Sequence, residues 1–243
     1  MARLAALVGK DGVFERLITD RGVLKYVASI LGASRFKLSS ANARVVPPIS
    51  NASDGPAGRQ PLHADFSAVA DDIGPWVANV LVALAPYSTT TGPLRAVPGS
   101  HRWHRLPAED MADPSAAHPA EVQITCDRGD CIVMNAHTWH SGMENLSLSG
   151  TRGKAAVHLF WCRRDMPQQQ HQKCLIDPRV QASMNESTRW ILALDSEENE
   201  QVMRELGDRI VSGAIPATSP PQTTRESKGS ETRSPTKNGT ARL

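Results

Sequence analysis

The spacing of apolar positions divides the chain into a helical start, a long central region of short strands and a helical end. Residues 1–35 are predicted to be helical, and their best-defined helix begins after Asp20 and ends at Gly32, because apolar residues recur between them three and four positions apart. Residues 195–211 repeat this spacing, which predicts a second helix with Asp195 in its N-terminal cap.

The central region consists of alternating or wholly apolar runs separated by Gly, Pro, Asn and Asp. Many short strands with such turns between them favour an all-β sandwich or barrel over a fold in which strands and helices alternate. The predicted strands are 36–46, 62–66, 76–84, 94–97, 122–125, 131–135 and 155–161.

Charge and composition separate the last thirty residues from the rest of the chain. The formal net charge is +2, yet residues 214–243 alone carry five Lys or Arg against two Glu. They contain almost no large aliphatic residues, so a disordered basic tail is predicted there. The preceding residues 1–213 are predicted to form a single domain with its core at about 36–165. Because this domain is close to neutral, no nucleic-acid partner is expected.

The cysteines and the apolar runs bear on the compartment. The four cysteines show no CxxC spacing, which is typical of reduced cysteines in an intracellular protein. No apolar run is long enough for a bilayer span, and the N-terminal run is too short for a signal peptide. A cytoplasmic protein without a membrane partner is therefore expected.

One pair of residues suggests a metal site. His63 and Asp65 lie two positions apart in a predicted strand, so their side chains point to the same face. Two His and one carboxylate on one face can bind a mononuclear iron and leave open positions. The other histidines available as a third ligand are His101, His104, His118, His137, His140, His158 and His171.

His140 has the most suggestive surroundings of these. It follows the apolar strand 131–135 and is itself followed by Ser and Gly, which leave room beside a crowded centre. Arg152 comes twelve positions later, where a guanidinium could bind a carboxylate bidentately. Two alternatives stay open: His137 could be the ligand instead, and Arg152 could be a solvated charge at the end of a strand.

Several segments together resemble the phytanoyl-CoA dioxygenase (PhyH-like) family. They are QPLHAD at 60–65, TGPLRAVPGSH at 91–101, GD at 129–130 and WHSG at 139–142, together with Asn145 and Arg152. The resemblance covers about residues 36–165. It implies a mainly β fold, namely a double-stranded β-helix (jelly-roll, cupin-like) core with flanking N- and C-terminal α-helices.

The resemblance also implies a ligand set and a co-substrate. His63, Asp65 and His140 would be the catalytic iron ligands, with Fe(II), 2-oxoglutarate and O₂ as the reacting partners. Arg152 would bind the distal carboxylate of 2-oxoglutarate, and Gln60 would contact the same co-substrate.

Two strand positions complete this comparison. Asn79 is a lesser candidate for the co-substrate site, at a position that is often polar in the family. Leu94 stands where many relatives have a Thr that hydrogen-bonds 2-oxoglutarate, so that contact must be absent or replaced here. Relatives commonly have a longer region before the first ligand, so this is expected to be a naturally short member or an incomplete sequence.

The function implied is a non-haem Fe(II)- and 2-oxoglutarate-dependent dioxygenase that hydroxylates a small organic molecule and releases succinate and CO₂. Because halogenating relatives lack the carboxylate ligand, Asp65 favours hydroxylation, with desaturation or rearrangement as further outcomes of the same hydrogen abstraction. Two alternatives remain. One is a catalytically inactive jelly-roll binding or sensor protein. The other is a zinc hydrolase, which would leave Arg152 without a role.

Overall fold

The protein is described from a computed structural model of the 243-residue chain. The model describes residues 2–48, 60–66, 70–147 and 153–211. Met1–Leu206 form one compact unit, and a second unit begins at Gly207. The predicted domain boundary at residue 213 and the predicted tail at 214–243 lie outside the described residues. Among the helices that the structure describes, none has both the length and the apolar character of a membrane span.

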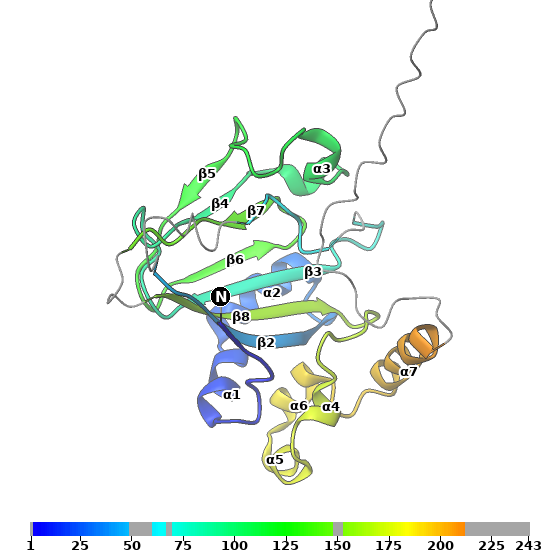
Figure 1. Ribbon diagram of the computed structural model, residues 1–243. Helices are drawn as coiled ribbons and strands as arrows, with labels where there is room; N and C mark the ends of the chain where they lie inside the picture. The colour runs from blue at the N-terminus through cyan, green and yellow to red at the C-terminus, as the bar shows by residue number, and fades with distance from the viewer. Residues whose placement is uncertain (1, 49–59, 67–69, 148–152, 212–243) are drawn as a thin grey trace, which may run out of the picture. The chain divides into compact units, whose positions relative to one another are not determined.

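The described strands pair into two antiparallel sheets (Figure 1). The larger sheet has the order β1–β2–β8–β3–β6, and the smaller has the order β5–β4–β7. The strands of the larger sheet are β1 (Ala2–Leu4), β2 (Phe36–Val46), β3 (Val77–Ala83), β6 (Cys131–Asn135) and β8 (Lys154–Arg163). Those of the smaller sheet are β4 (Leu94–Ala96), β5 (Val122–Ile124) and β7 (His140–Gly142).

Most of the predicted strands are confirmed, and one is wrong. Strands form within one or two residues of the predicted bounds everywhere except at 62–66. There the structure has a single bridge, between His63 and His140. The reason is that successive backbone N–H groups donate to different segments: Leu62 to the Pro114 carbonyl, His63 to the His140 carbonyl and Asp65 to the Ala136 carbonyl. Residues 136–142 lie along this segment, but only the His63 and His140 pair exchanges both bonds, so the pairing is too irregular for a strand.

The prediction that residues 1–35 are helical is wrong for the first few residues, because β1 pairs with β2 at the edge of the larger sheet. Two helices follow, α1 (Gly12–Ile18) and α2 (Arg21–Leu31). The predicted cap of α2 is confirmed: the Asp20 carboxylate accepts a hydrogen bond from the Val23 N–H at 3.0 Å. Gly32 ends the helix with φ at +91°, in the region that favours glycine.

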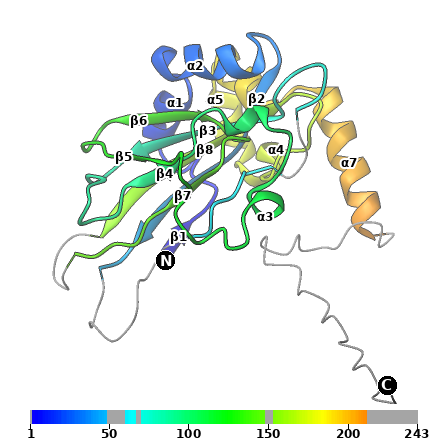
Figure 2. The same ribbon diagram turned by 90° about the horizontal axis from the view of Figure 1, so that it is seen from above.

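One face of the larger sheet is apolar and is covered by helices. Helix α2 packs on β3 and β6 (Figure 2), and α6 (Glu186–Leu192) packs on β2. The packed strand residues alternate along their strands, as a half-buried sheet requires. They include Ala41, Ala78, Val80, Val82, Val157, Leu159 and Trp161, which form one cluster with Val23, Val27 and Leu31 of α2. This cluster is the main core of the described unit.

The intervening residues of the same strands point to the opposite face. Arg44 of β2, Asn79 of β3 and His158 of β8 belong to this set, as the strand register requires. The smaller sheet contributes Leu94 and His140 to the same space. A polar pocket therefore lies between the two sheets, on the side away from the apolar core.

Short helices fill the segment after β8, for which no helix is predicted. They are α4 (Gln172–Leu175), α5 (Pro178–Ser183) and α6, and α3 (Pro107–Asp110) lies earlier in the chain. Asp177 caps α5 and Asn185 caps α6 through side-chain oxygens. The predicted helix at 195–211 is confirmed as α7 (Glu197–Val211), but its predicted cap is wrong. The Ser196 hydroxyl accepts from the Asn199 N–H, because the Asp195 carboxylate is instead bound by Arg189 at 2.7 Å.

The turn at Gly92 gives a prediction about stability. Gly92 has φ at +89°, and an added Cβ would lie within 2.5 Å of the Met143 carbonyl oxygen. Gly92→Ala is expected to lower the free energy of unfolding by about 3 kcal/mol, because backbone atoms must move to relieve the contact. Gly99→Ala is the matched control: its φ is +84° and nothing lies within 4 Å, so only the left-handed backbone costs about 1 kcal/mol. Equal losses in denaturant titrations would contradict this reading.

Candidate metal centre

The His-x-Asp segment is held against β7 by paired backbone hydrogen bonds. The His63 N–H donates to the His140 carbonyl at 3.0 Å, and the His140 N–H donates to the His63 carbonyl at 2.9 Å. Residues that exchange both bonds in this way lie directly opposite one another, with side chains on the same face. The two imidazoles therefore meet although their residues are far apart in the chain, and their ring centroids are 4.7 Å apart.

Asp65 completes a compact group with these two imidazoles. Its Oδ1 lies 3.9 Å from Nε2 of His63, and its Oδ2 lies 3.5 Å from Nε2 of His140. One ligand atom from each of the three residues falls within 4.8 Å of the others. The structure thus brings together all three residues expected from the sequence to bind a metal.

Both imidazoles are oriented by backbone carbonyls. Nδ1 of His63 lies 2.9 Å from the Pro61 carbonyl oxygen, and Nδ1 of His140 lies 2.8 Å from that of Thr138. A carbonyl oxygen only accepts, so each Nδ1 carries the proton and each Nε2 presents a lone pair to the group. This arrangement is the usual support for a metal-binding His.

The carboxylate is oriented by a side chain from the larger sheet. Nδ2 of Asn79 donates to Oδ2 of Asp65 at 2.9 Å, whereas the buried Oδ1 of Asn79 has no hydrogen-bond partner among the residues that the structure describes. Asn79, expected as a lesser candidate for the co-substrate site, thus lies against the carboxylate. The spacing of residues along the sequence cannot reveal this contact, because Asn79 lies in β3 and Asp65 lies in a loop.

The charges of the group suit a cation. Burial by itself would raise the pKa of Asp65, but the neighbouring His140 and His63 and the Asn79 hydrogen bond hold that pKa below its ordinary value. Burial lowers the pKa of His63, and the adjacent His140 lowers it further. An ionised carboxylate beside a neutral imidazole is the protonation state that metal binding needs.

The group lies at the bottom of the pocket between the sheets. The pocket is lined by Arg44, Val46, Gln60, His63, Asp65, Asn79, Leu81, Tyr87, Leu94, Met134, His140, Gly142, Lys154 and His158. Gln60 is therefore at the expected place, and its backbone N–H donates to the Gly142 carbonyl at 3.1 Å. Leu94 contributes an apolar wall. Arg152 lies outside the described residues.

His137, the alternative third ligand, does not join the group. Its Nε2 accepts a hydrogen bond from the Trp76 N–H at 3.1 Å, and its ring makes an edge contact with Phe66. His137 and His140 are thus only three positions apart, but their side chains have different partners. The geometry favours His140.

Sequence reasoning missed two cations in the pocket. The Lys154 ammonium donates to the carbonyls of Gly92 and Met143 at 3.0 and 2.8 Å, and burial lowers its pKa to about 8. Within the described part of the chain the buried Nε of Arg44 has no hydrogen-bond partner, and burial lowers the pKa of this guanidinium. Alternation along β2 and β8 was the available signal, since Arg44 and Lys154 share the inner face of the sheet.

His158, one of the histidines that the sequence offered as a third ligand, also lines this pocket. Burial, followed by the nearby Arg44, lowers the pKa of His158 to about 3. The imidazole is therefore neutral at physiological pH. It adds a polar but uncharged wall beside Arg44.

Arg95 is a further unforeseen contributor, because it supports the site from behind. Its side chain is fully buried, and its Nε donates to the Ser141 hydroxyl at 2.7 Å. Its Nη2 donates to the carbonyls of Pro114 and Gln60 at 3.0 and 3.4 Å. One guanidinium thus ties the segment before His63 to the strand that carries His140.

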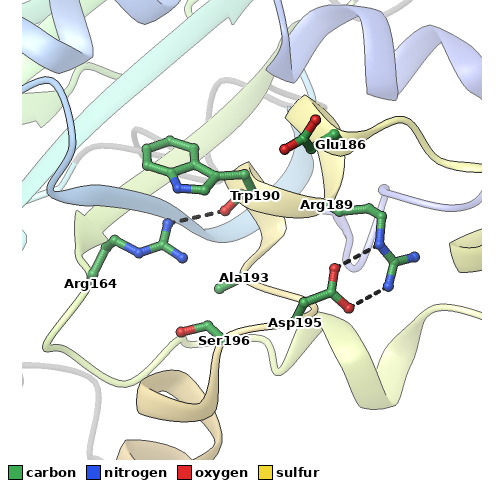
Figure 3. Close-up of a pocket in the computed structure, with 7 residues that line it drawn as sticks. All are labelled: Arg164, Glu186, Arg189, Trp190, Ala193, Asp195 and Ser196. Atoms are coloured by element: carbon green, nitrogen blue, oxygen red, sulfur yellow. Dashed lines mark hydrogen bonds and ion pairs between the residues drawn. The ribbon is translucent and has the colours of Figure 1, made fainter.

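A larger surface hollow of about 490 Å³ lies beside α6 (Figure 3). Three of its four charged groups are already engaged: Arg189 with Asp195, and Arg164 with the Trp190 carbonyl at 3.1 Å. The Arg164 guanidinium also stacks over the Trp190 ring. The pocket between the sheets is smaller, about 60 Å³, yet it holds the group of potential metal ligands. We therefore take that pocket as the functional site.

The chain is similar in sequence to fungal dioxygenases. Over 98 residues the chain is 26% identical to the dioxygenase aneA of Aspergillus aculeatus, a match that covers 40% of this chain and 32% of that protein. Over 100 residues it is 27% identical to the iron/alpha-ketoglutarate-dependent dioxygenase penM of Penicillium thymicola, covering 38% of this chain and 30% of that protein. These matches span about a third of the length of each relative.

A solved structure shares the fold. HygX from Streptomyces hygroscopicus, determined with nickel and 2-oxoglutarate bound, matches with a TM-score of 0.55 and 16% identity, over 68% of this chain and 71% of that one. The family model for phytanoyl-CoA dioxygenase (PhyH) matches residues 3–153, which include the whole His63, Asp65 and His140 group. On this match the chain belongs to the phytanoyl-CoA dioxygenase family.

Proposed function

We propose that the protein is a non-haem Fe(II)- and 2-oxoglutarate-dependent dioxygenase that hydroxylates a small organic molecule, with release of succinate and CO₂. The observation that carries this proposal is the group formed by His63, Asp65 and His140, whose ligand atoms lie within 4.8 Å of one another. Family membership supports it, as does the similarity to penM, an iron/alpha-ketoglutarate-dependent dioxygenase.

The donor atoms fit ferrous iron. Two imidazole nitrogens and one carboxylate on one side of an ion are the facial set typical of non-haem Fe(II) oxygenases, and they leave positions open for other ligands. The buried, unpartnered Oδ1 of Asn79 beside the carboxylate offers a further polar atom in this space. Iron with 2-oxoglutarate and O₂ would supply the oxidising power needed to break a C–H bond.

The protein side chains then have separate tasks. His63 and His140 would bind the ion through Nε2, each held by its carbonyl partner. Asp65 would bind it through a carboxylate oxygen while Asn79 keeps that group in place. A retained carboxylate occupies the position that a halide would need, so we propose hydroxylation over halogenation.

The remaining pocket suits an anionic co-substrate. We propose that Arg152 binds the distal carboxylate of 2-oxoglutarate and that Gln60 lies beside it. Lys154 and Arg44 support this assignment, because they make the described part of the pocket electropositive. Leu94 leaves an apolar wall where a hydrogen-bonding residue would otherwise stand.

We also propose that the two sheets are parts of a double-stranded β-helix. The antiparallel pairing of both sheets and the ligands placed between them support it, as does the likeness to HygX.

The direct test is the anaerobic addition of Fe(II) and 2-oxoglutarate to the folded chain. A weak metal-to-ligand charge-transfer band in the visible spectrum is expected when the co-substrate chelates the iron. A folded sample that binds iron but develops no band would rule out the co-substrate assignment. A sample that binds no iron would rule out the metal site as well.

Substitution of single residues should show whether His140 or His137 is the metal ligand. Asp65→Ala and His140→Ala are each expected to abolish succinate formation, because each removes one of three ligands. His137→Ala should leave it measurable, since His137 is bonded to the Trp76 backbone and lies outside the group. If His137→Ala were the inactive variant, the choice of His140 would be wrong.

Asn79 gives a second prediction. Asn79→Ala is expected to weaken Fe(II) affinity by about 10- to 100-fold, because Asp65 loses the donor that orients it. Asn42→Ala is the control, since Asn42 is a buried Asn of β2 that bonds Gln170 instead. It should lower stability and leave metal affinity unchanged in calorimetric titrations. Equal losses of metal affinity would show that Asn79 has no specific role.

The co-substrate site can be tested through its cations. Arg152→Ala should raise the KM for 2-oxoglutarate by about tenfold or more, since a charge-assisted bidentate pair is lost. Lys154→Met should have the smaller effect on KM, because the Lys154 ammonium already bonds two backbone carbonyls. The reverse order would transfer the role to Lys154.

A further inference from the structure

A second group of reactive side chains lies outside the metal pocket, where α4 meets α7. Sγ of Cys174 lies 3.2 Å from Nδ1 of His171, and Nε2 of the same imidazole lies 2.9 Å from Oε1 of Glu200. A nucleophile beside a base that a third group orients is the general signature of an activated nucleophile. None of the three residues lines the pocket between the sheets.

The hydrogen bonds determine which way the imidazole acts. A carboxylate only accepts, so Nε2 of His171 carries the proton that it donates to Glu200. Nδ1 is then the acceptor and faces the thiol of Cys174. His171 is therefore oriented as a base toward the sulfur, and the Glu200 charge favours the imidazolium that forms when the proton moves.

Two members of the group follow residues that are hydrogen-bonded to β2. Gln170, which precedes His171, donates to Oδ1 of Asn42 and accepts from the Ala41 N–H. Asn199, which precedes Glu200, is 1% exposed and accepts from the Lys37 ammonium at 2.7 Å. The positions of His171 and Glu200 are therefore tied to β2 through their neighbours.

The other cysteines provide an internal comparison. Burial raises the pKa of Cys162 to about 11 and also raises that of Cys126. Cys131 is exposed like Cys174, but burial of its sulfur and the nearby Asp20 and Asp130 raise its pKa. Among the cysteines, all of which the structure describes, Cys174 is the one with an imidazole against its sulfur.

The surroundings favour a small reagent over a bound substrate. Cys174 is on the open surface, and it lines neither the hollow beside α6 nor the pocket between the sheets. A nearby hollow of about 360 Å³ is reached by Lys173 and Glu200, not by the sulfur. Transfer of an acyl group would need donors for a developing oxyanion, whereas a peroxide needs only an accessible thiolate.

We propose that Cys174, His171 and Glu200 form a peroxide-sensitive thiol site, at which the Cys174 sulfur is oxidised to sulfenic acid. His171 takes the thiol proton, and the sulfur attacks one oxygen of hydrogen peroxide. An S–O bond forms while the O–O bond breaks. The departing hydroxide takes the proton from His171 and leaves as water. Sulfur loses two electrons and the peroxide gains them, which gives the reversible first step of thiol oxidation.

The test compares the two exposed cysteines in one sample. The purified full chain is treated with hydrogen peroxide in the presence of a metal chelator and a sulfenic-acid trapping reagent, and each cysteine is quantified by peptide mass spectrometry. Cys174 is expected to be trapped roughly 100-fold faster than Cys131, the lower end of what general-base assistance gives. Equal rates at the two cysteines would overturn the proposal.

Two variants separate the imidazole from simple exposure. His171→Ala should reduce trapping at Cys174 to the rate seen at Cys131, and Glu200→Gln should reduce it in part, with thermal melting confirming that each variant is folded. An unchanged rate in folded His171→Ala would overturn the role of the base. Alkylation by iodoacetamide is a separate readout: preferential alkylation of Cys174 without trapped sulfenic acid would overturn the assignment to peroxide.

Discussion

The exchange of backbone hydrogen bonds between His63 and His140 is the contact on which the metal centre depends. It joins a segment with no partner strand to β7, and it places two imidazoles from distant parts of the chain on one face. Arg95 reinforces it through the Ser141 hydroxyl and the Gln60 carbonyl. Without this bridge His63 and Asp65 would share a face with nothing to complete a ligand set.

The larger sheet serves the site by having two unlike faces. Its outer face is apolar and packs under α2 and α6, which supplies most of the described core. Its inner face carries Arg44, Lys154 and His158, whose pKa values are all lowered by burial. Burying charged groups opposes folding. The apolar packing on the other face of the sheet must therefore outweigh the cost of burying Arg44 and Lys154.

Local features of the fold were predictable, whereas long-range ones were not. The strands β2, β3 and β8 and the caps Asp20 and Gly32 follow from short patterns in the sequence. The strand expected at 62–66 did not form, because strand pairing depends on a neighbour that no local pattern specifies.

The same distinction holds for the candidate site. His63, Asp65 and His140 could be identified because their motif is local and the family resemblance joins its parts. The contact of Asn79 with Asp65, and the presence of Arg44 and Lys154 in the pocket, depend on which strands are neighbours. Alternation in the sequence shows that such residues share a face of the sheet, but not which face lines a pocket.

The two kinds of ligand are supported differently, and this makes the site unequally sensitive to substitution. Each imidazole is held by the carbonyl two residues before it, Pro61 for His63 and Thr138 for His140. Changing a neighbouring side chain leaves such a carbonyl in place, so only a shift of the backbone can remove that support. Asp65 instead relies on the Asn79 side chain, which a single substitution can delete. Substitutions in the larger sheet would therefore affect metal binding mainly through the position of the Asp65 carboxylate.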